Sequence, residues 1–190
     1  KFDSNFNPIW AKSYGELGDD GFGVIKIHNN HLYLIGLVRS SYIYIDSALI
    51  SFPINASSRY IILKMDMMGN FQWARKYGNI DIYSGTLKSN TLAIKNDKIY
   101  FNGHSFSNNE NVYFFEGGPT LTSVGSGTGD YFIACYDTNG VFQWNTISQS
   151  FGSEYLTELA CDTMGNVYGI GNFDYTIKFP GDTLHSMGGS

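Results

Sequence analysis

Acidic side chains recur at similar places along the chain, and their spacing suits ligand binding. Four of them follow the three tryptophans, Trp10, Trp73 and Trp144, by eight to ten residues: Asp19, Asp20, Asp81 and Glu154. Carboxylate oxygens are the ligands that calcium prefers, and they also pair with amines. The repetition therefore predicts carboxylates gathered on one face of a repeated fold, where they could bind calcium or an amine. The alternative is a set of solvated loop carboxylates with no common ligand.

Aromatic side chains in the long polar connections form a second candidate site. Sugar rings stack on exposed aromatic faces, whereas aromatic residues beside strands commonly pack in a core. The candidates are Tyr42, Tyr44, Tyr113–Phe115, Phe173 and Tyr175. The sequence leaves both interpretations open.

Motifs of known enzyme classes are missing from the sequence. It contains no G-x-S-x-G, no phosphate-binding loop, no H-E-x-x-H and no paired-cysteine motif. We therefore predict a non-enzymatic protein with no catalytic residue and no cofactor beyond the calcium considered above. Cys135 and Cys161 both lie in apolar strand patterns. They are predicted to be buried thiols, and the pattern alone leaves a disulfide between them open.

The composition narrows the class of partner. The 190 residues carry a net charge of −5, and nucleic-acid-binding proteins instead concentrate Lys and Arg. Apolar runs extend for only a few residues, whereas a membrane span needs roughly 20. Aromatic residues make up 16% of the chain and charged residues only 15%. This mixture predicts short buried strands joined by tight turns, with neither nucleic-acid binding nor membrane insertion.

A repeat positions all of these candidates. Asp3, Asp66 and Asp137 each stand seven residues before a tryptophan, and glycines follow the second and third of them at Gly69 and Gly140. A second marker, Tyr-x-x-Gly, recurs every 67 or 68 residues as Tyr33–Gly36, Tyr100–Gly103 and Tyr168–Gly171. Another Asp-x-x-Gly turn stands before the last of these, at Asp162 and Gly165. Asp can cap such a turn with its carboxylate, and Gly tolerates the positive φ that closes it.

Each period contains four strand-like runs arranged as two hairpins. Near-continuous apolar runs precede the Asp-x-x-Gly turns at 59–66 and 130–137, as in strands packed on both faces. We predict an all-β chain, a β-propeller-type array of four-stranded antiparallel blades with about three repeats. The units span 1–15 (partial), 16–78, 79–150 and 151–190 (partial). A β-solenoid is the rival architecture. We expect the array to be a segment of a larger propeller, completed by further blades of the same chain or of another chain.

The repeat resembles the bacterial β-propeller repeat family called SBBP. Three segments carry the resemblance: Asp162-Thr-Met-Gly165-Asn166-Val-Tyr168-Gly-Ile-Gly171, Phe179-Pro180-Gly181 and Gly129-Asp130-Tyr-Phe132, the last continuing to Asp137, Gly140 and Trp144. The resemblance covers essentially the whole chain, although the Phe-Pro-Gly segment is degenerate in the first two repeats. It implies a secreted or cell-surface protein, similar to versions from Bacteroidota.

The resemblance implies a binding or scaffold module that mediates protein–protein assembly. A carbohydrate-binding propeller, or an accessory module of a polysaccharide-acting enzyme, is the alternative. Three Asp-Ser/Thr-apolar tripeptides fit the pattern that Bacteroidota O-glycosylate, with acceptors Ser47, Thr163 and Thr183.

Overall fold

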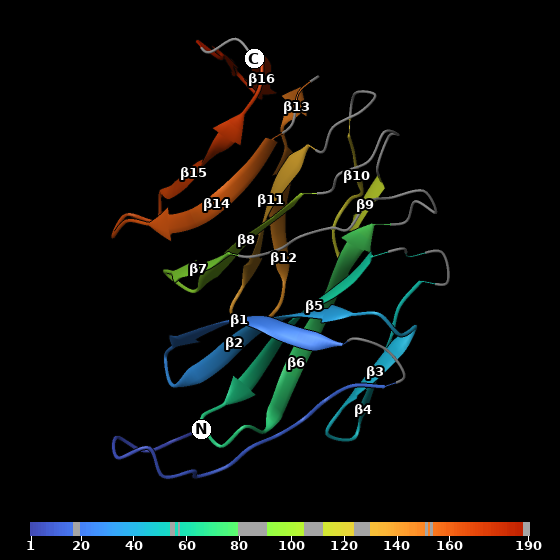
Figure 1. Cartoon of the computed structure of the whole chain (residues 1–190), viewed down its shortest axis with the longest axis vertical. Helices are drawn as coiled ribbons and strands as arrows, with labels where there is room; N and C mark the ends of the chain where they lie inside the picture. Colours follow the sequence, from blue (N-terminus) through green and yellow to red (C-terminus); the bar gives the residue numbers. More distant parts are fainter. Residues whose placement is uncertain are drawn as a thin grey trace.

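The computed structural model is an all-β molecule built from antiparallel sheets. It describes residues 1–16, 20–53, 56, 58–79, 91–104, 112–123, 130–150, 152 and 154–187. No helix occurs within these ranges, and every strand pairing is antiparallel. Figure 1 shows the sheets following one another along the long axis of the molecule, from the N-terminal sheet to the C-terminal strands.

The first sheet has the order β1-β2-β5-β6-β9-β10. Its first four strands form a meander: β1 (Gly21–His28), β2 (His31–Val38), β5 (Ser58–Asp66) and β6 (Phe71–Asn79). Asn29 and Asn30 join β1 to β2 with φ values of 44° and 56°. Two positive φ angles define the type I′ turn, whose twist matches that of a hairpin. The predicted hairpin at this turn is confirmed by the pairing of His28 with His31.

The second sheet repeats this meander in the order β12-β11-β8-β7. Its strands are β7 (Leu92–Lys95), β8 (Lys98–His104), β11 (Tyr131–Asp137) and β12 (Phe142–Ile147). Asn96 and Asp97 form its type I′ turn, with φ values of 48° and 55°. A third copy of the first hairpin consists of β14 (Glu154–Cys161) and β15 (Val167–Phe173).

A short hairpin follows the second strand of each repeat, and this element was not predicted. The hairpins are β3 (Tyr42–Ile45) with β4 (Ala48–Ser51), β9 (Val112–Phe115) with β10 (Leu121–Thr122), and β16 (Thr176–Phe179) with β17 (Asp182–His185). The sequence predicts long polar connections at these stretches. The alternation Tyr42-Ile43-Tyr44-Ile45, exposed and buried in turn, was the missed signal.

These hairpins also connect successive repeats. β6 of the first meander pairs with β9, the hairpin strand of the second, through Tyr77 opposite Phe115. In the same way β13 (Gln149–Ser150), directly after β12, pairs with β16 of the third repeat. Each meander therefore continues by main-chain pairing into the hairpin of the next repeat.

The main core lies between the first two sheets. Tyr33, Ile62, Tyr77, Phe101 and Phe132 are all fully buried there. Tyr113 and Phe115 belong to the same cluster at 0% and 3% exposure, so of the two interpretations left open by the sequence, packing in the core applies to them. The pairing of β9 with β6 turns these two rings inward.

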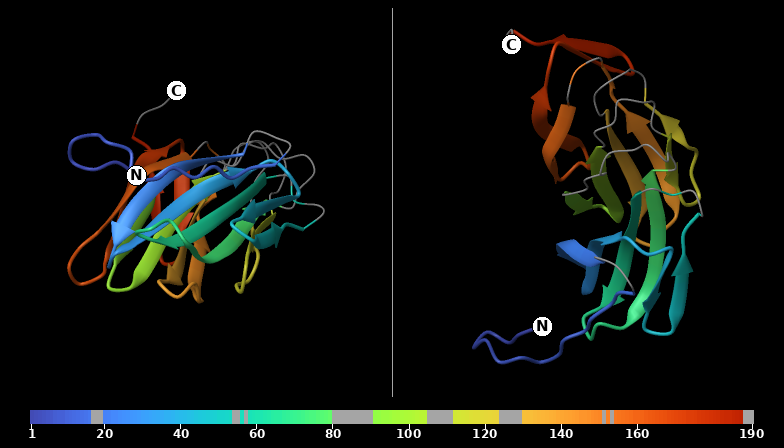
Figure 2. Two further views of the ribbon diagram at one scale, coloured as in Figure 1. Left: turned by 90° about the horizontal axis from the view of Figure 1, so that it is seen from below. Right: turned by 45° about the vertical axis from the view of Figure 1, so that its right-hand side comes forward.

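Two smaller clusters cover the outer faces of these sheets. One lies between the first sheet, the β3–β4 hairpin and Trp10, and the other between the second sheet and β14–β17. Figure 2 shows the sheets packed face to face in succession. The coarse prediction of an all-β, antiparallel fold is confirmed, and no closed ring of sheets forms within the described ranges. Within the same ranges, no helix is long and apolar enough to cross a membrane.

Candidate functional site

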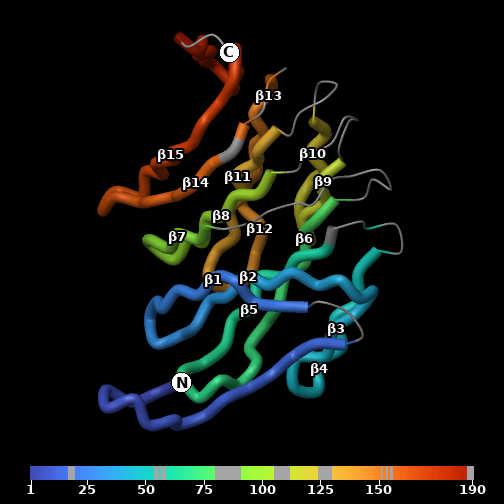
Figure 3. The backbone as a smooth tube through the Cα atoms, viewed as in Figure 1, coloured from blue at the N-terminus to red at the C-terminus, as the bar shows by residue number. Residues whose placement is uncertain are grey.

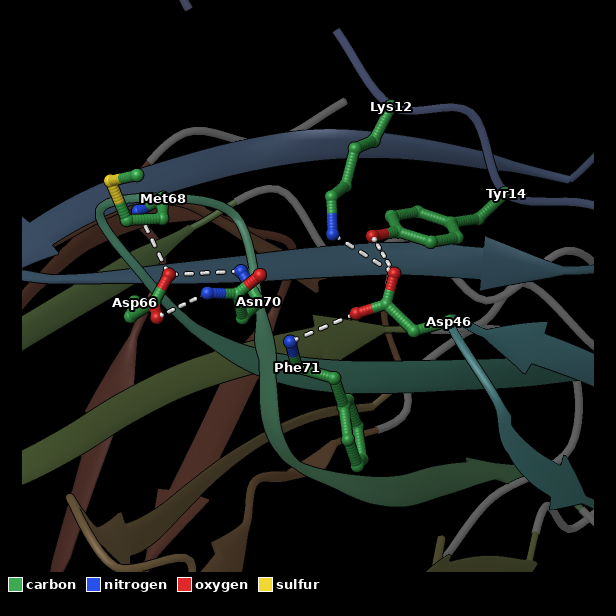
Figure 4. A network of polar contacts seen from close by, with 7 residues as sticks. All are labelled: Lys12, Tyr14, Asp46, Asp66, Met68, Asn70 and Phe71. Carbon is green, nitrogen blue, oxygen red and sulfur yellow. Dashed lines mark hydrogen bonds and ion pairs between the residues drawn. The ribbon is translucent and has the colours of Figure 1, made fainter. Parts of the chain in front are cut away.

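The Asp-x-x-Gly segments form closed turns held by the aspartate side chain. Figure 4 shows Asp66, whose Oδ1 accepts hydrogen bonds from the backbone N–H groups of Met68 (2.8 Å) and Asn70 (2.9 Å). The Asn70 side chain donates to Asp66 Oδ2, and the backbone of Gly69 closes the turn at φ +81°. The hydrogen bonds from Asn70 lower the pKa of Asp66, which stays ionised. The turns at Asp137 and Asp162 have the same two backbone hydrogen bonds to Oδ1, and Asp162 also has the side-chain contact, from Asn166.

Two of these turns, at Asp66 and Asp137, follow the third strand of a repeat, and each accepts a hydrogen bond from a tryptophan of the preceding repeat. We call this contact the tryptophan clamp. Trp73 Nε1 and Lys64 Nζ both donate to the carbonyl oxygen of Thr138, at 3.2 and 2.9 Å. Arg75 Nε donates to the carbonyl oxygen of Gly140 at 2.6 Å, and its guanidinium lies 5.5 Å from the Trp73 ring. The clamp therefore joins the first meander to the turn of the second.

The same clamp joins the N-terminal segment to the first sheet. Trp10 Nε1 and Lys1 Nζ both donate to the carbonyl oxygen of Met67, each at 3.3 Å. The position of Lys1, two residues before Asp3, matches that of Lys64 before Asp66. Trp10 and Trp73 therefore act as structural residues that tie one repeat to the turn of the next.

Glycine is required where the indole lies on the turn. A methyl group added at Gly69 would lie 3.1 Å from the Trp10 ring, and one at Gly140 would lie 3.1 Å from the Trp73 ring. Both glycines also have positive φ, +81° and +79°. The clamp thus explains why the turn needs Gly for two independent reasons, its backbone angle and the closeness of the indole.

Trp144 holds the same repeat position but clamps nothing in the described part of the chain. Its side chain is 41% exposed, and its contact with the Tyr100 ring, 6.0 Å between centroids, matches the 6.3 Å contact of Tyr33 with Trp73. Cys135 occupies the repeat position of Lys64. It lies opposite Tyr100 and Trp144, as Lys64 lies opposite Tyr33 and Trp73. Trp144 therefore lies beside the same tyrosine position as the clamp residue Trp73, but no turn covers it among the described residues.

The two outer faces of the array expose side chains at repeat positions that are buried between neighbouring repeats. Tyr33 and Tyr100, which face the following sheet, are 1% and 6% exposed, whereas Tyr168 at the same repeat position is 58% exposed. At the other end Ile25 and Ile27 of β1 are exposed, although their counterparts on β7, Leu92 and Ile94, are buried and half-buried against the first sheet. Residues that are buried between repeats are thus open on the two outer faces.

An apolar groove of about 580 Å³ lies on the N-terminal one of these faces. The groove runs between the N-terminal segment and β1, β2 and β5. Trp10, Ile25, Ile27 and Leu34 supply apolar lining, and Lys1 and Lys12 line it as well. The backbone trace in Figure 3 shows this segment running along the first sheet towards the β3–β4 hairpin.

Asp20 does not have the free carboxylate that a ligand site needs. Its Oδ1 accepts from the backbone N–H of Arg39 at 2.6 Å, and its Oδ2 accepts from Glu16 N and Ser40 Oγ. Partial burial opposes ionisation of this carboxyl, but the hydrogen bonds together lower its pKa. Asp20 therefore acts as a cap that fixes the end of β2 to the segment before β1.

Glu154, ten residues after Trp144, is in a different environment. It is fully buried, its Oε2 accepts from Ser148 Oγ at 2.7 Å, and its Oε1 has no hydrogen-bond partner among the described residues. Burial raises the pKa of Glu154 to about 7, and the nearby Asp130 and Asp174 carboxylates act in the same direction. The structure does not bring Asp20 and Glu154 into contact, and Asp19 and Asp81 lie outside the described residues. Among the described residues, no group of three or more His, Cys, Asp or Glu side chains could hold a metal ion.

The aromatic candidates divide into exposed and buried residues. Tyr42 and Tyr44 are 40% and 46% exposed, and their rings meet edge to face at 5.8 Å beside a shallow depression on the β3–β4 hairpin. Tyr175 is 66% exposed in the turn before β16, where it has a φ of 59°. Phe173 is half-buried against the third core cluster. The hairpin tyrosines are thus the exposed aromatic pair of the predicted set.

The three proposed glycosylation acceptors are all exposed, and they lie in turns or on the last strand. Ser47 follows Asp46 in the β3–β4 turn, Thr163 lies in the Asp162 turn, and Thr183 lies on β17.

Asp46 joins the β3–β4 turn to the N-terminal segment. In Figure 4, Asp46 Oδ1 accepts hydrogen bonds from Lys12 Nζ (2.9 Å) and Tyr14 OH (3.2 Å), while Oδ2 accepts one from Phe71 N. The hydrogen bond from Lys12 is the main reason that the pKa of Asp46 is lowered. Asp46 thus anchors the N-terminal segment to the hairpin.

The two cysteines are separate thiols. Cys135 is fully buried and Cys161 is half-buried, both in or against the third core cluster. Burial raises the pKa of Cys135 to about 11, so its thiol is protonated and unreactive at neutral pH.

Comparison with known proteins yields no relative from which to transfer a function. No protein-family model matches the chain, and no curated protein matches it significantly. The functional argument therefore depends on the repeated contacts themselves.

Proposed function

We propose that this chain is a β-propeller-type segment that serves as a non-enzymatic scaffold and binding module. The observation that carries the proposal is the tryptophan clamp, which occurs at two successive junctions with the same donors and acceptors. Contacts that recur from repeat to repeat are typical of arrays whose stability comes from neighbouring units. Propellers are built from four-stranded antiparallel blades, and the two four-stranded meanders support this proposal.

The surfaces of the array support a role in assembly. Both outer faces expose residues whose counterparts are buried between repeats, including Ile25, Ile27 and Tyr168. Open apolar faces of this kind favour association with further sheets. The resemblance to SBBP repeats extends this proposal to a secreted or cell-surface protein of the kind found in Bacteroidota, with a protein as its partner.

A carbohydrate-binding propeller, or an accessory module of a polysaccharide-acting enzyme, is the second candidate. The exposed Tyr42–Tyr44 pair on the β3–β4 hairpin favours it, because sugars stack on aromatic faces. The two candidates differ in which surface is used. A scaffold uses the sheet faces, whereas a glycan would use the hairpin.

Glycan-array binding and partner capture distinguish the two functions. We expect no glycan signal, and we expect affinity capture from the native cells to identify a protein that still binds when both components are purified. Tyr42→Ala and Tyr44→Ala should leave that binding unchanged. Glycan binding that is lost in these two variants would support the second candidate, and turnover of a polysaccharide by the chain would contradict a non-enzymatic role.

A further inference from the structure

We propose that the free edge of β15 and the exposed face of Trp144 form one docking site for a β-hairpin with an Asp-x-x-Gly turn, supplied by a further repeat unit. This inference rests on the proposed scaffold function and names the element that the scaffold receives. We define the docking site as residues 167–171 of β15 (Val167–Phe173) together with Trp144.

The first component of the docking site is a strand edge. The equivalent strands of the first two repeats are paired along both edges. β2 pairs with β1 and β5, and β8 pairs with β7 and β11. β15 pairs with β14 alone within the described ranges. Tyr168 and Ile170 on this strand are 58% and 67% exposed, although Tyr33 and Ile35 at the same positions of β2 are buried. An antiparallel strand is thus the element that completes β15 as β5 completes β2.

The second component is the indole of Trp144. In the second repeat, the strand that pairs with β8 leads directly into the turn that Trp73 grips. A strand paired with β15 would bring its own turn to Trp144 by the same path, because β15 is the repeat equivalent of β8. The Tyr100–Trp144 and Tyr33–Trp73 rings lie at similar distances, 6.0 and 6.3 Å, with interplanar angles of 45° and 63°, so the indole already lies beside the equivalent tyrosine. Its Nε1–H is then free to donate to the carbonyl oxygen of the residue after the aspartate.

The turn of the incoming hairpin must contain glycine at its fourth position. At both built clamps a β-carbon on that residue would lie 3.1 Å from the indole. Cys135 and Thr146 replace the Lys64 and Arg75 of the built clamp, so no cationic side chain assists at this junction. The close fit of the indole on the glycine therefore contributes most of the recognition.

This requirement argues against a second copy of the chain as the occupant. In a copy, the Asp162 turn is already held by Asn96, whose Nδ2 donates to the carbonyl oxygen of Thr163 at 3.4 Å. The turn that a copy could offer is therefore the one at Asp3, which has the same contacts with its carboxylate Oδ1. Phe6 occupies its glycine position with φ +63° and is 86% exposed. Its benzyl group would lie where the Trp144 ring must sit. A further repeat unit with Gly at this position has no such obstacle.

The test is a chain extended by a copy of its own β5–β6 hairpin. A copy of residues 56–79 joined after Ser190 places the copied Asp66 as far from Tyr168 as Asp66 itself lies from Tyr33. The matched control carries Gly69→Phe in the copy alone, which reproduces the Asp3 turn. Hydrogen exchange of the Trp144 indole N–H and of the β15 amides is measured by NMR, with Trp144→Phe in the parent chain assigning the indole signal.

We expect the glycine extension to slow exchange of the indole and of the β15 amides by roughly tenfold or more, the factor that about 1.4 kcal/mol provides. The phenylalanine extension should slow it far less. Equal exchange in the parent and extended chains would overturn the proposal, as would equal protection by the two extensions. A parent dimer that buries Trp144 would assign the site to a second copy instead. The scaffold function is tested separately by the purified partner, so either proposal can fail alone.

Discussion

Trp73 and Trp144 provide a direct measure of what the tryptophan clamp contributes to stability. The two residues hold the same repeat position, but Trp73 is half-buried on the Thr138–Gly140 turn and Trp144 is 41% exposed. Removing a well-buried tryptophan typically costs about 3–5 kcal/mol. The partial burial of Trp73 reduces this to about 2 kcal/mol, and loss of its indole hydrogen bond adds about 1 kcal/mol.

Trp144→Ala should cost much less than Trp73→Ala. The Trp144 ring has the Tyr100 contact but no turn beneath it and no Nε1 acceptor within the described part of the chain, so about 1 kcal/mol is expected. The difference of about 2 kcal/mol corresponds to roughly 4–8 °C in melting temperature for a chain of this size.

Urea and thermal unfolding of both alanine variants, followed by circular dichroism, test this difference. Trp73→Phe is the control, because it keeps an aromatic ring and removes the Nε1 donor. Its cost should fall between those of wild type and Trp73→Ala. Equal destabilisation by Trp73→Ala and Trp144→Ala would refute the clamp, since the covered and uncovered positions would then be energetically equivalent.

Three further predictions concern single residues, and all use the same unfolding measurements. Phe6→Gly should stabilise the chain by about 1 kcal/mol, because Phe6 holds a φ of +63° that only glycine adopts without strain; no gain would mean that its side chain contributes more than the strain costs. Gly140→Ala should cost roughly 1 kcal/mol more than Gly181→Ala, since both have positive φ but only Gly140 lies against Trp73; equal costs would contradict the contact. The pKa of Glu154 is raised from 4.5 to about 7, so its contribution should be fully present below pH 4.5 and lost as the pH rises through 7. Glu154→Gln should abolish this pH dependence, which is at most about 3 kcal/mol in wild type; a variant with an unchanged profile would show that another group titrates.

Local features of the fold could be predicted from the sequence because short segments determine them. The type I′ turns need two residues that tolerate positive φ, and His28-Asn29-Asn30 supplies them. The Asp-x-x-Gly turns likewise depend on an aspartate and a glycine three residues apart. The central strand β5 was identified by its continuous apolar run, and Ile61 and Ile62 are indeed fully buried on opposite faces.

The candidate sites were harder to predict, because side-chain exposure depends on which strands pair. Tyr113 and Phe115 resemble Tyr42 and Tyr44 in sequence, yet the pairing of β9 with β6 buries the first pair. Asp20 fits a ligand pattern by spacing, but the backbone N–H groups of Arg39 and Ser40, which follow β2, already occupy its carboxylate. No local pattern reports either fact.

Pairing between repeats has a consequence for how the array holds together. The sequence period runs from tryptophan to tryptophan, but the β6–β9 and β13–β16 ladders cross from one repeat to the next. The tryptophan clamp crosses in the same direction, from a fourth strand to the next turn. The junction between the first two repeats is therefore held at two points, by the β6–β9 pairing and by the Trp73 indole. The junction to the third repeat has the β13–β16 pairing alone within the described residues. Because repeat arrays gain stability chiefly from neighbouring units, loosening one clamp should weaken both sheets that meet there and leave the more distant junction intact.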